Sequence, residues 1–354
     1  MEAATRNRIE ARIQWVEDEM EAVFASRPAG VELYRIQRYH LGWLSARFEP
    51  LPRDLARRYG GKKLRGVLCL LACEAAGGAP GAAVPAAAAV ELIHNFSLIH
   101  DDLEDEDPER RHRPTVWRLW GVAQAVNAGS NMQALVNEAA LRLTGRGVAA
   151  ERTLGVMGAL SRAMLAMTEG QALDLGWQDR WDLRVDDYLQ MAAGKTSALT
   201  EAAAWCGAAV AATDAVALDH FARFGRAFGL AFQARDDYLG IWGRSEQTGK
   251  PVGADIQQGK RSLPIVHALE QTALRGDEAA AQSELRIGLE RREVERVLAA
   301  LEETGSQAFV EQVAAQYTAE ALAHLDAIAP LSPEAGGGAR DLRAIAAYAL
   351  GREE

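Results

Sequence analysis

A run of acidic residues follows an apolar stretch that ends near residue 100. Asp101 and Asp105 lie four positions apart, so on a helix their carboxylates project from one face about one turn apart. Carboxylates this close repel one another unless a divalent cation neutralises them, and Mg²⁺ accepts such oxygens together with those of a bound phosphate. A solvated acidic helix end is the simpler alternative, since most charge runs face water. The spacing by itself indicates a cation site.

A second aspartate pair, Asp236 and Asp237, closes another apolar helical stretch. Arg110 and Arg111 follow the first pair closely, and two lysines follow the second. One such pair is weak support for a metal site. Two pairs, each closing a long apolar helix and each followed by basic residues, resemble the two aspartate-rich motifs of the trans-isoprenyl diphosphate synthases, the polyprenyl synthetase family. The resemblance covers nearly all of the chain after about residue 55.

The resemblance implies both a fold and an activity. The implied fold is all-α, a single domain over residues 1–354 in which long helices surround a central active-site cavity, with variable helices over residues 1–50. This is the isoprenoid synthase fold. The implied activity is Mg²⁺-dependent condensation of isopentenyl diphosphate with an allylic diphosphate, which gives a short-chain all-trans prenyl diphosphate. We therefore also expect three Mg²⁺ ions per site and a homodimer.

Roles follow where this chain matches the family's motifs. The resemblance implies that Asp101, Asp105 and Asp236 hold the metal, and that Asp102 and Lys195 belong with them to the catalytic set. The residues implied for isopentenyl diphosphate are Lys62, Arg65, His94 and Arg111. The residues implied for the allylic diphosphate are Arg110, Lys195, Thr196, Lys250 and Lys260.

These residue types suit the binding of diphosphate. Lys62 and Arg65 are three positions apart where two glycines open a helix, so we expect them to present two cations on one helix face. A helix N-terminus already favours anions. His94 lies seven residues, about two turns, before Asp101 and therefore on nearly the same face. A lone helical histidine is usually structural, but this one matches a histidine of the family. The adjacent arginines after the first motif offer forked donors that match phosphate oxygens.

Three positions within the binding motifs depart from the family's pattern. Gly66 replaces its usual proline and Lys63 its usual arginine, which keeps the positive charge but leaves the local helix geometry open. In the second motif Gly240 stands four residues after Asp236, where the family has a third aspartate, so one carboxylate ligand is missing. Gln233 precedes Asp236 by three positions, shares its helix face and can reach the same site.

Side chains beneath the first aspartate motif limit product length in this family. Ser97 lies in line with Asp101 on an ideal helix, and its small side chain lets a growing prenyl chain pass. Phe96 lies beside the line of Asp101 and Ser97 on the helix. The resemblance implies that an aromatic side chain at this position forms the floor of the tunnel that holds the growing prenyl chain. Arg110 follows Asp101 by nine positions, without the insertion typical of bacterial farnesyl diphosphate synthases. The combination resembles geranylgeranyl diphosphate synthases, so we expect a twenty-carbon product, with fifteen carbons as the alternative.

Composition restricts the class of protein further. Hydrophobic residues make up 49% of the chain with little strand-like alternation, which favours a helical protein with a large core. The net charge of −10 argues against a nucleic-acid partner, because phosphate backbones require a basic surface. We expect no membrane span and a cytoplasmic location, since the N-terminal residues are charged throughout. The three cysteines lie in apolar helical stretches and are expected to be reduced core residues.

Prolines and glycines predict where the positioning helices begin and end. An amphipathic helix over residues 1–25 should end at residues 26–30, and a second helix should stop near Phe48, before two prolines. Asp186 and Asp187 precede a later helix and should cap it. Gly253 marks a loop of the kind that acts as a lid, and residues 336–338 predict a glycine-rich loop in the last helical region.

Two other functions remain open from the residues alone. A terpene cyclase on the same fold would ionise a prenyl diphosphate without a second substrate, and the retained isopentenyl diphosphate residues argue against it. The missing third aspartate and unexpectedly polar residues keep it open; the polar residues are Asn137, Glu138, Thr200 and Glu201. A catalytically silent partner subunit is the second alternative, although this chain keeps its metal-ligand candidates.

Overall fold

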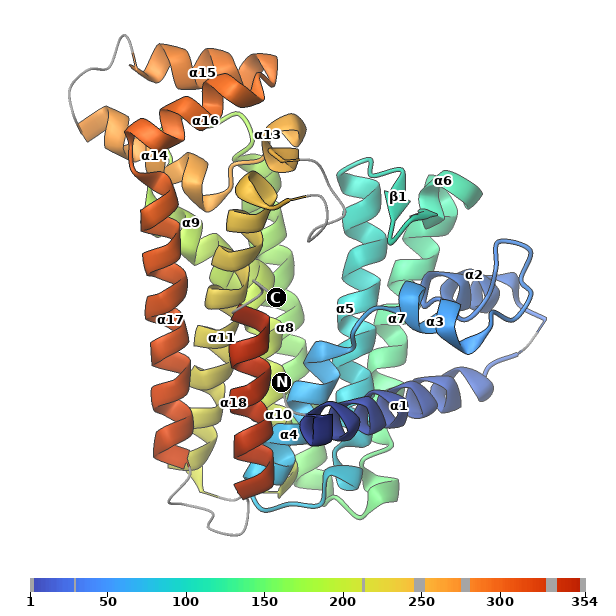
Figure 1. Ribbon diagram of the computed structural model, residues 1–354. Coiled ribbons are helices and arrows are strands. Elements are labelled where there is room, and N and C mark those ends of the chain that lie inside the picture. The colour runs from blue at the N-terminus through green and yellow to red at the C-terminus, as the bar shows by residue number, and fades with distance from the viewer. Residues whose placement is uncertain are drawn as a thin grey trace. The chain divides into compact units, whose positions relative to one another are not determined.

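The computed structural model describes residues 3–28, 30–211, 214–244, 252–274, 281–328 and 336–350. Helices account for most of these residues (Figure 1). Their only strands form a short antiparallel hairpin of β1 (Glu109–Arg110) and β2 (Arg113–Pro114). The all-α fold class predicted from the sequence is confirmed. Among the described helices, none is long and apolar enough to cross a membrane.

The helices fall into an earlier and a later set along the chain. The earlier helices are α1 (Ala3–Ala25), α2 (Glu32–His40), α3 (Arg53–Gly60), α4 (Leu64–Ala75), η1 (Pro80–Ala82), α5 (Val84–Glu104), α6 (Val116–Trp120), α7 (Val122–Leu141), η2 (Thr144–Arg146) and α8 (Ala150–Gly176). The later helices are α9 (Val185–Ala192), η3 (Ala193–Ser197), α10 (Ala198–Ala211), α11 (Ala215–Trp242), α13 (Ala254–Gln258), α14 (Leu263–Leu274), α15 (Ala281–Arg291), α16 (Val294–Glu303), α17 (Ser306–Ile328) and α18 (Gly336–Leu350).

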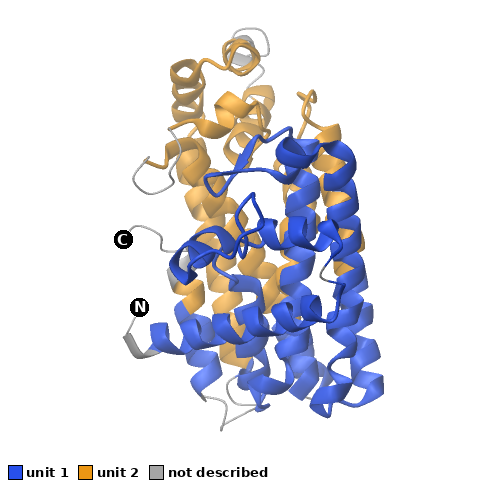
Figure 2. Cartoon of the chain, turned by 90° about the vertical axis from the view of Figure 1, so that its right-hand side faces the viewer, with its two compact units in different colours: residues 1–161, 202–221, 328–344 blue, residues 162–201, 222–327, 345–354 orange. Residues whose placement is uncertain are grey.

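The chain divides into two compact units (Figure 2). Unit 1 comprises residues 1–161, 202–221 and 328–344, and it carries the first aspartate motif. Unit 2 comprises residues 162–201, 222–327 and 345–354, and it carries the second. The single-domain organisation expected from the sequence stays a prediction.

The core of unit 1 forms where α5 packs against α4 and α7. The first half of α5 is rich in alanine, and Ala86, Ala87, Ala88 and Ala89 are fully buried. Small side chains allow neighbouring helices to approach closely, and an added Cβ at Gly207 would collide with the carbonyl oxygen of Cys69. The cysteines are free and buried, as predicted, and burial raises the pKa of the Cys69 thiol. They are inert parts of the core.

Unit 2 contains two clusters of buried apolar residues. One includes Tyr188, Met191 and Leu230, from α9 and α11. The other joins Ile241 at the end of α11 to Ile256 of α13. The two clusters fix both ends of the segment that carries the second aspartate motif.

The prediction that the second helix stops near Phe48 is wrong. α2 ends at His40, because Gly42 adopts a φ of 83° that a helix cannot contain. A Cβ at this position would also meet the backbone nitrogen of Gly60 at 2.6 Å, so only glycine fits against α3. The chain then turns through Phe48, which has a φ of 63°, and a further helix, α3, precedes the glycine pair.

Two other predicted boundaries also differ from the structure. The helix expected to open at residues 60–65 begins at Leu64, because Gly61 and Lys63 both have positive φ angles. The glycines at residues 336–338 form the first turn of α18 rather than a loop. A Cβ at Gly338 would meet the backbone nitrogen of Ala75 at 2.5 Å, so glycine allows this turn to pack closely against the end of α4.

Candidate active site

The first aspartate motif ends α5 as the sequence predicts. The backbone N–H of Asp105, the last cap residue of the helix, donates to the carbonyl oxygen of Asp101 over 2.8 Å. This bond places the two side chains one turn apart on one face, and both are at least partly exposed. The C-terminal end of a helix carries a partial negative charge, which adds to the attraction of the carboxylates for a cation.

Asp102 has a different environment from its neighbours. Its side chain is buried and accepts a hydrogen bond from Nε of Arg110 over 2.5 Å. Burial raises the pKa of Asp102 to about 6, although the Arg110 charge acts in the opposite direction. Asp102 therefore orients Arg110, and its second carboxylate oxygen has no hydrogen-bond partner among the described residues.

The arginine pair lies on the β1–β2 hairpin. The two turn residues of the hairpin, Arg111 and His112, have φ angles of 51° and 60°. This is the left-handed conformation that a tight two-residue hairpin requires. Nη1 of Arg111 donates to the carbonyl oxygen of Tyr59 over 3.0 Å. A Cβ at Gly61 would lie 2.7 Å from Cζ of Arg111, so the glycine leaves room for this guanidinium. Burial lowers the pKa of Arg111.

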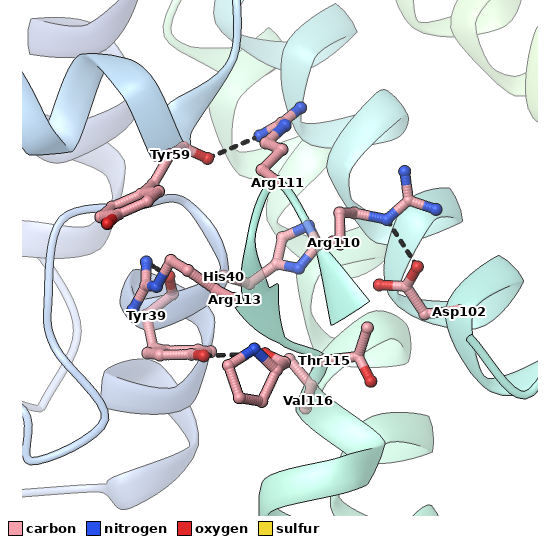
Figure 3. Close-up of a pocket in the computed structure, with 10 residues that line it drawn as sticks. Tyr39, His40, Tyr59, Asp102, Arg110, Arg111, Arg113, Thr115 and Val116 are labelled. Atoms are coloured by element: carbon pink, nitrogen blue, oxygen red, sulfur yellow. Dashed lines mark hydrogen bonds and ion pairs between the residues drawn. The ribbon is translucent and has the colours of Figure 1, made fainter. Parts of the chain in front are cut away.

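A small pocket lies beside the hairpin (Figure 3). Its lining residues are Tyr39, His40, Tyr59, Asp102, Arg110, Arg111, Arg113, Pro114, Thr115 and Val116. Three of these residues carry guanidinium groups and one carries a carboxylate, so the lining has an excess of positive charge. Arg113 is held over the ring of Tyr39 at 3.8 Å and donates to the carbonyl oxygens of Tyr39 and Leu44. The pocket suits an anionic group.

The residues predicted for isopentenyl diphosphate gather partly at this end of unit 1. His94 is half-buried, and the loss of solvent around its ring, together with the positive charges of Arg65, Arg111, Arg110 and Lys63, holds its pKa well below the usual value. The ring is therefore neutral at neutral pH and has one N–H to donate. Lys62 is exposed and precedes α4, so the predicted shared helix face of Lys62 and Arg65 is wrong. The positive φ of Lys63 turns the chain between them.

Two departures from the family's pattern have a structural explanation. Lys63 is buried, and its ammonium donates to the carbonyl oxygen of Gly60. The backbone N–H of Gly66 donates to the buried Glu91 carboxylate over 2.8 Å, a bond that proline cannot make. Glycine at this position therefore satisfies a buried acidic group.

Phe96 and Ser97 lie on α5 beneath the motif. Phe96 is buried and contacts His100 edge to face, with ring centroids 6.0 Å apart. The Ser97 hydroxyl donates to the carbonyl oxygen of His94 over 2.9 Å, so it is satisfied within its own helix. A Cβ at Gly129 of α7 would collide with the His100 ring, so α7 packs closely here. The role of Phe96 in product length stays a prediction.

In unit 2, Lys195 and Thr196 lie in a π-helical turn, η3. Such turns are rare and frequently lie at functional sites. A Cβ at Gly170 of α8 would meet the backbone of Lys195, so the turn packs directly on a glycine. The ammonium of Lys195 pairs with Asp174, also on α8. Sequence reasoning missed Asp174 as the partner of Lys195, because the two residues lie 21 positions apart and no local pattern joins them.

The second motif separates its two aspartates. Asp236 is exposed, whereas Asp237 is buried and accepts hydrogen bonds from the hydroxyl of Tyr188 and the backbone N–H of Leu263. Burial raises the pKa of Asp237 to about 7. Gln233 donates to Asp237 over 2.8 Å and accepts from the Thr196 hydroxyl over 2.7 Å. Gln233 therefore links the π-turn to Asp237, and its predicted reach to the site of Asp236 stays a prediction.

Three of the four unexpectedly polar residues have partners in the structure. The Thr200 hydroxyl donates to the carbonyl oxygen of Ser197, and Glu201 lies 3.8 Å from Arg226. Glu138 pairs with Arg27 over 2.6 Å, and Asn137 is exposed on α7. Lys260 is exposed just after α13, whereas Lys250 lies outside the described residues. The predicted cap of α9 is confirmed for Asp187, whose carboxylate accepts from the backbone N–H of Arg184.

The sequence model of the polyprenyl synthetases matches residues 53–303, which include both aspartate motifs, the hairpin and the π-turn. The chain belongs to the polyprenyl synthetase family. The resemblance inferred from the two motifs is therefore confirmed.

Similar polyprenyl synthetases include enzymes of two product lengths. A (2E,6E)-farnesyl diphosphate synthase of Mycobacterium bovis is 44% identical over 243 residues, which are 69% of this chain and 65% of that protein. This match thus spans slightly less than two thirds of the relative. A geranylgeranyl diphosphate synthase of Mycobacterium tuberculosis is 40% identical over 81% of this chain and 79% of its own length.

Solved structures of polyprenyl synthetases share the fold. The geranylgeranyl pyrophosphate synthetase of Pyrococcus horikoshii superimposes with a TM-score of 0.84 and 29% identity, covering 99% of both chains. The isoprenoid synthase fold expected from the motifs is confirmed by this likeness.

The carboxylates suit the Mg²⁺ that the family implies. Asp101, Asp105 and Asp236 offer hard oxygen donors near the C-terminal ends of α5 and α11, where the helix dipoles also favour cations. Within the described part of the chain, no three His, Cys, Asp or Glu side chains form a group able to hold a metal alone. The carboxylates of each unit therefore fit Mg²⁺, which commonly takes one or two carboxylates together with substrate phosphates and water.

Proposed function

We propose that the protein is a Mg²⁺-dependent trans-prenyltransferase that condenses isopentenyl diphosphate with an allylic diphosphate. The observation that supports this most is the match of residues 53–303 to the family, with an at least partly exposed aspartate in the last two turns of each motif helix, Asp101 in α5 and Asp236 in α11. The arginine-lined pocket beside the first motif adds the positive charge that a diphosphate substrate needs.

The reaction breaks the allylic carbon–oxygen bond and leaves a carbocation and diphosphate. Bound Mg²⁺ would stabilise the negative charge that develops on the leaving diphosphate. Asp101, Asp105 and Asp236 would hold the metal, with three ions per site proposed from the resemblance. Arg110, oriented by Asp102, and Lys195, oriented by Asp174, would bind the diphosphate oxygens. Thr196, Lys250 and Lys260 complete the proposed allylic set.

The second substrate supplies the carbon nucleophile. Lys62, Arg65 and Arg111 would bind the diphosphate of isopentenyl diphosphate, and neutral His94 would donate a hydrogen bond to it. The double bond then attacks the allylic carbocation, which forms one carbon–carbon bond. The departing diphosphate takes the proton from the adjacent carbon, so atoms and charges balance. Holding both substrates close together makes coupling faster than capture of the cation by water.

We propose geranylgeranyl diphosphate as the main product and farnesyl diphosphate as the alternative. Relatives of both kinds are similar to this chain, so the proposal depends on Phe96 and on the short spacing between Asp101 and Arg110. A homodimer and a cytoplasmic location are further proposals from the family resemblance and the N-terminal sequence.

Product analysis tests the proposal against its two alternatives. The protein is incubated with Mg²⁺, isopentenyl diphosphate and, in turn, the five-, ten- and fifteen-carbon allylic diphosphates. We expect longer prenyl diphosphates and no turnover in excess chelator. A terpene cyclase would instead release a hydrocarbon or alcohol without isopentenyl diphosphate. A silent subunit would consume neither substrate.

A further inference from the structure

Gly240 marks the place in the second motif where a third carboxylate is missing. It follows Asp236 by four residues on α11, so the two positions share one helix face. A Cβ added at Gly240 would collide with the Asp255 carboxylate, whose Cγ would lie 2.5 Å away. The Asp255 carboxylate therefore occupies the space into which a side chain at position 240 would project.

The local fold fixes Asp255 in this place. Gly253, with a φ of 74°, is the N-terminal cap of α13, and its backbone N–H donates to the carbonyl oxygen of Ile241 over 3.0 Å. Ile256 is fully buried and packs in the same cluster as Ile241. The carbonyl oxygen of Asp255 accepts from the backbone N–H of Lys260 over 3.0 Å. These contacts hold the five-residue helix against the end of α11. The Asp255 carboxylate then packs against the Cα of Gly240.

We infer that Asp255 supplies the carboxylate that Gly240 lacks and joins Asp236 in holding a divalent cation. This inference rests on the proposed function and names one more residue of its metal site. Asp255 is partly exposed, as an aspartate that meets a cation and its water ligands must be. Asp237, the nearest other carboxylate in the motif, already accepts three hydrogen bonds and is buried. Asp255 is therefore the better second ligand.

A purely structural role for Asp255 is the alternative. It lies in the first turn of α13, where an acidic side chain favours the helix N-terminus. A helix-capping role would not require glycine at position 240. It would also not require contact with the face of α11 that carries Asp236. The two readings differ in what happens when the carboxylate is moved from position 255 to position 240.

The test uses four variants of the full-length protein. Asp255→Asn removes the charge with little change in shape. Gly240→Asp places a second carboxylate where Asp255 already lies. The double variant Gly240→Asp/Asp255→Ala moves the carboxylate onto α11. Asp186→Asn is the matched control, because Asp186 is an exposed aspartate in the first turn of another helix of the same unit.

The main measurement is binding rather than turnover. Binding of Mn²⁺ in the presence of inorganic diphosphate is followed by electron paramagnetic resonance, and calorimetry measures how Mg²⁺ changes the affinity for inorganic diphosphate. We expect Asp255→Asn and Gly240→Asp each to weaken metal binding about 10- to 100-fold. The double variant should recover to within about threefold of wild type, and the control should match wild type.

Two results would overturn the inference. One is unchanged metal affinity in Asp255→Asn with normal thermal unfolding. The other is a double variant that binds metal no better than Gly240→Asp although circular dichroism shows it folded. Failure of the proposed function looks different, because the wild type itself would then form no prenyl diphosphate. Wild-type turnover together with an unaffected Asp255→Asn variant would reject the role of Asp255 alone.

Discussion

Each aspartate motif places one carboxylate outward and one inward. Asp101 is partly exposed and Asp236 is exposed, whereas Asp102 and Asp237 are buried and hydrogen-bonded. Adjacent residues on a helix point about 100° apart, so a pair of neighbours can serve two tasks. The outward carboxylate faces the side from which we propose that metal binds, and the inward one orients a neighbouring group.

The outward carboxylate should dominate catalysis. We expect Asp101→Ala to lower turnover by about three orders of magnitude, because a charge that would hold metal against the leaving group is lost. The fold should be unaffected or slightly stabilised, since repulsion from Asp105 is relieved. Turnover and thermal unfolding are measured together, with Glu104→Gln as the control for loss of a nearby exposed charge. Near-normal turnover in Asp101→Ala would contradict the metal assignment.

Arg111 should distinguish the two substrates. Loss of its phosphate contact in Arg111→Ala should cost about 1.5 to 3 kcal/mol of binding free energy. This corresponds to about a 10- to 150-fold weaker affinity for isopentenyl diphosphate, with a much smaller change for the allylic substrate. Separate titrations of both substrates provide the measurement, and the exposed Arg118→Ala is the control. Equal losses of affinity for both substrates would contradict the assignment of Arg111 to isopentenyl diphosphate.

At the scale of single elements, short segments set the positions of the site residues. The hairpin turn at Arg111 and His112, the α4 start at Lys63 and Gly66, and the π-turn at Lys195 all depart from regular geometry. Each departure is matched by a glycine or a buried hydrogen bond nearby. The regular helices form the scaffold, and these irregular segments set the orientation of the charged side chains.

The start of α4 provides a stability prediction. Gly66→Pro restores the family's usual residue, yet we expect it to lower the free energy of unfolding by about 1 to 3 kcal/mol, because a buried Glu91 oxygen loses its donor. Gly66→Ala keeps the N–H but adds a Cβ 2.9 Å from Cγ of Glu91, so it controls for crowding. Denaturant unfolding compares the two variants. A proline variant as stable as the alanine variant would show that the hydrogen bond contributes nothing.

The α5 segment beneath Asp101 provides a prediction of product length. Phe96→Ala should open the tunnel floor and shift products to longer chains, and its burial predicts a stability cost of about 3 to 5 kcal/mol. Phe24→Ala, a fully buried phenylalanine of α1, controls for the loss of stability alone. Products are separated by chromatography at a temperature where both variants are folded. An unchanged product length would direct attention to Met132 or Gln133 as the floor.

At the scale of the whole molecule, sequence predicted more of the fold than of the side-chain partners. Helical spacing correctly placed Asp101 and Asp105 on one face, because that relation is local. It could not predict the pairing of Lys195 with Asp174, which requires knowing how α8 packs on η3. It also misplaced the end of α2, since Gly42 is selected by the approach of α3 rather than by its own neighbours.

The acid stability of the molecule should depend on His40. Burial and the surrounding arginines hold its pKa well below 6.5 in the folded state. The unfolded chain binds a proton below about pH 6.5 that the folded chain does not, so this residue lowers stability as the pH falls. The slope is at most about 1.4 kcal/mol per pH unit.

His40→Gln should therefore flatten the loss of stability between pH 6.5 and pH 5. The free energy of unfolding is measured across this range for wild type, His40→Gln and His112→Gln, where His112 is an exposed control. The control should keep the wild-type slope. Parallel curves for wild type and His40→Gln would show that His40 does not resist protonation in the folded protein.

The π-turn at residues 193–197 also changes the rotational phase of the helices that it joins. It contains one residue more than an α-helical turn, which rotates α9 by about 100° relative to α10. This offset lets Thr196 reach Gln233 while Thr200, on the following turn, packs against Gly225 and Gly229. Deleting a single residue here would restore a regular helix, and the side chains on one side of the deletion would then all face the wrong direction.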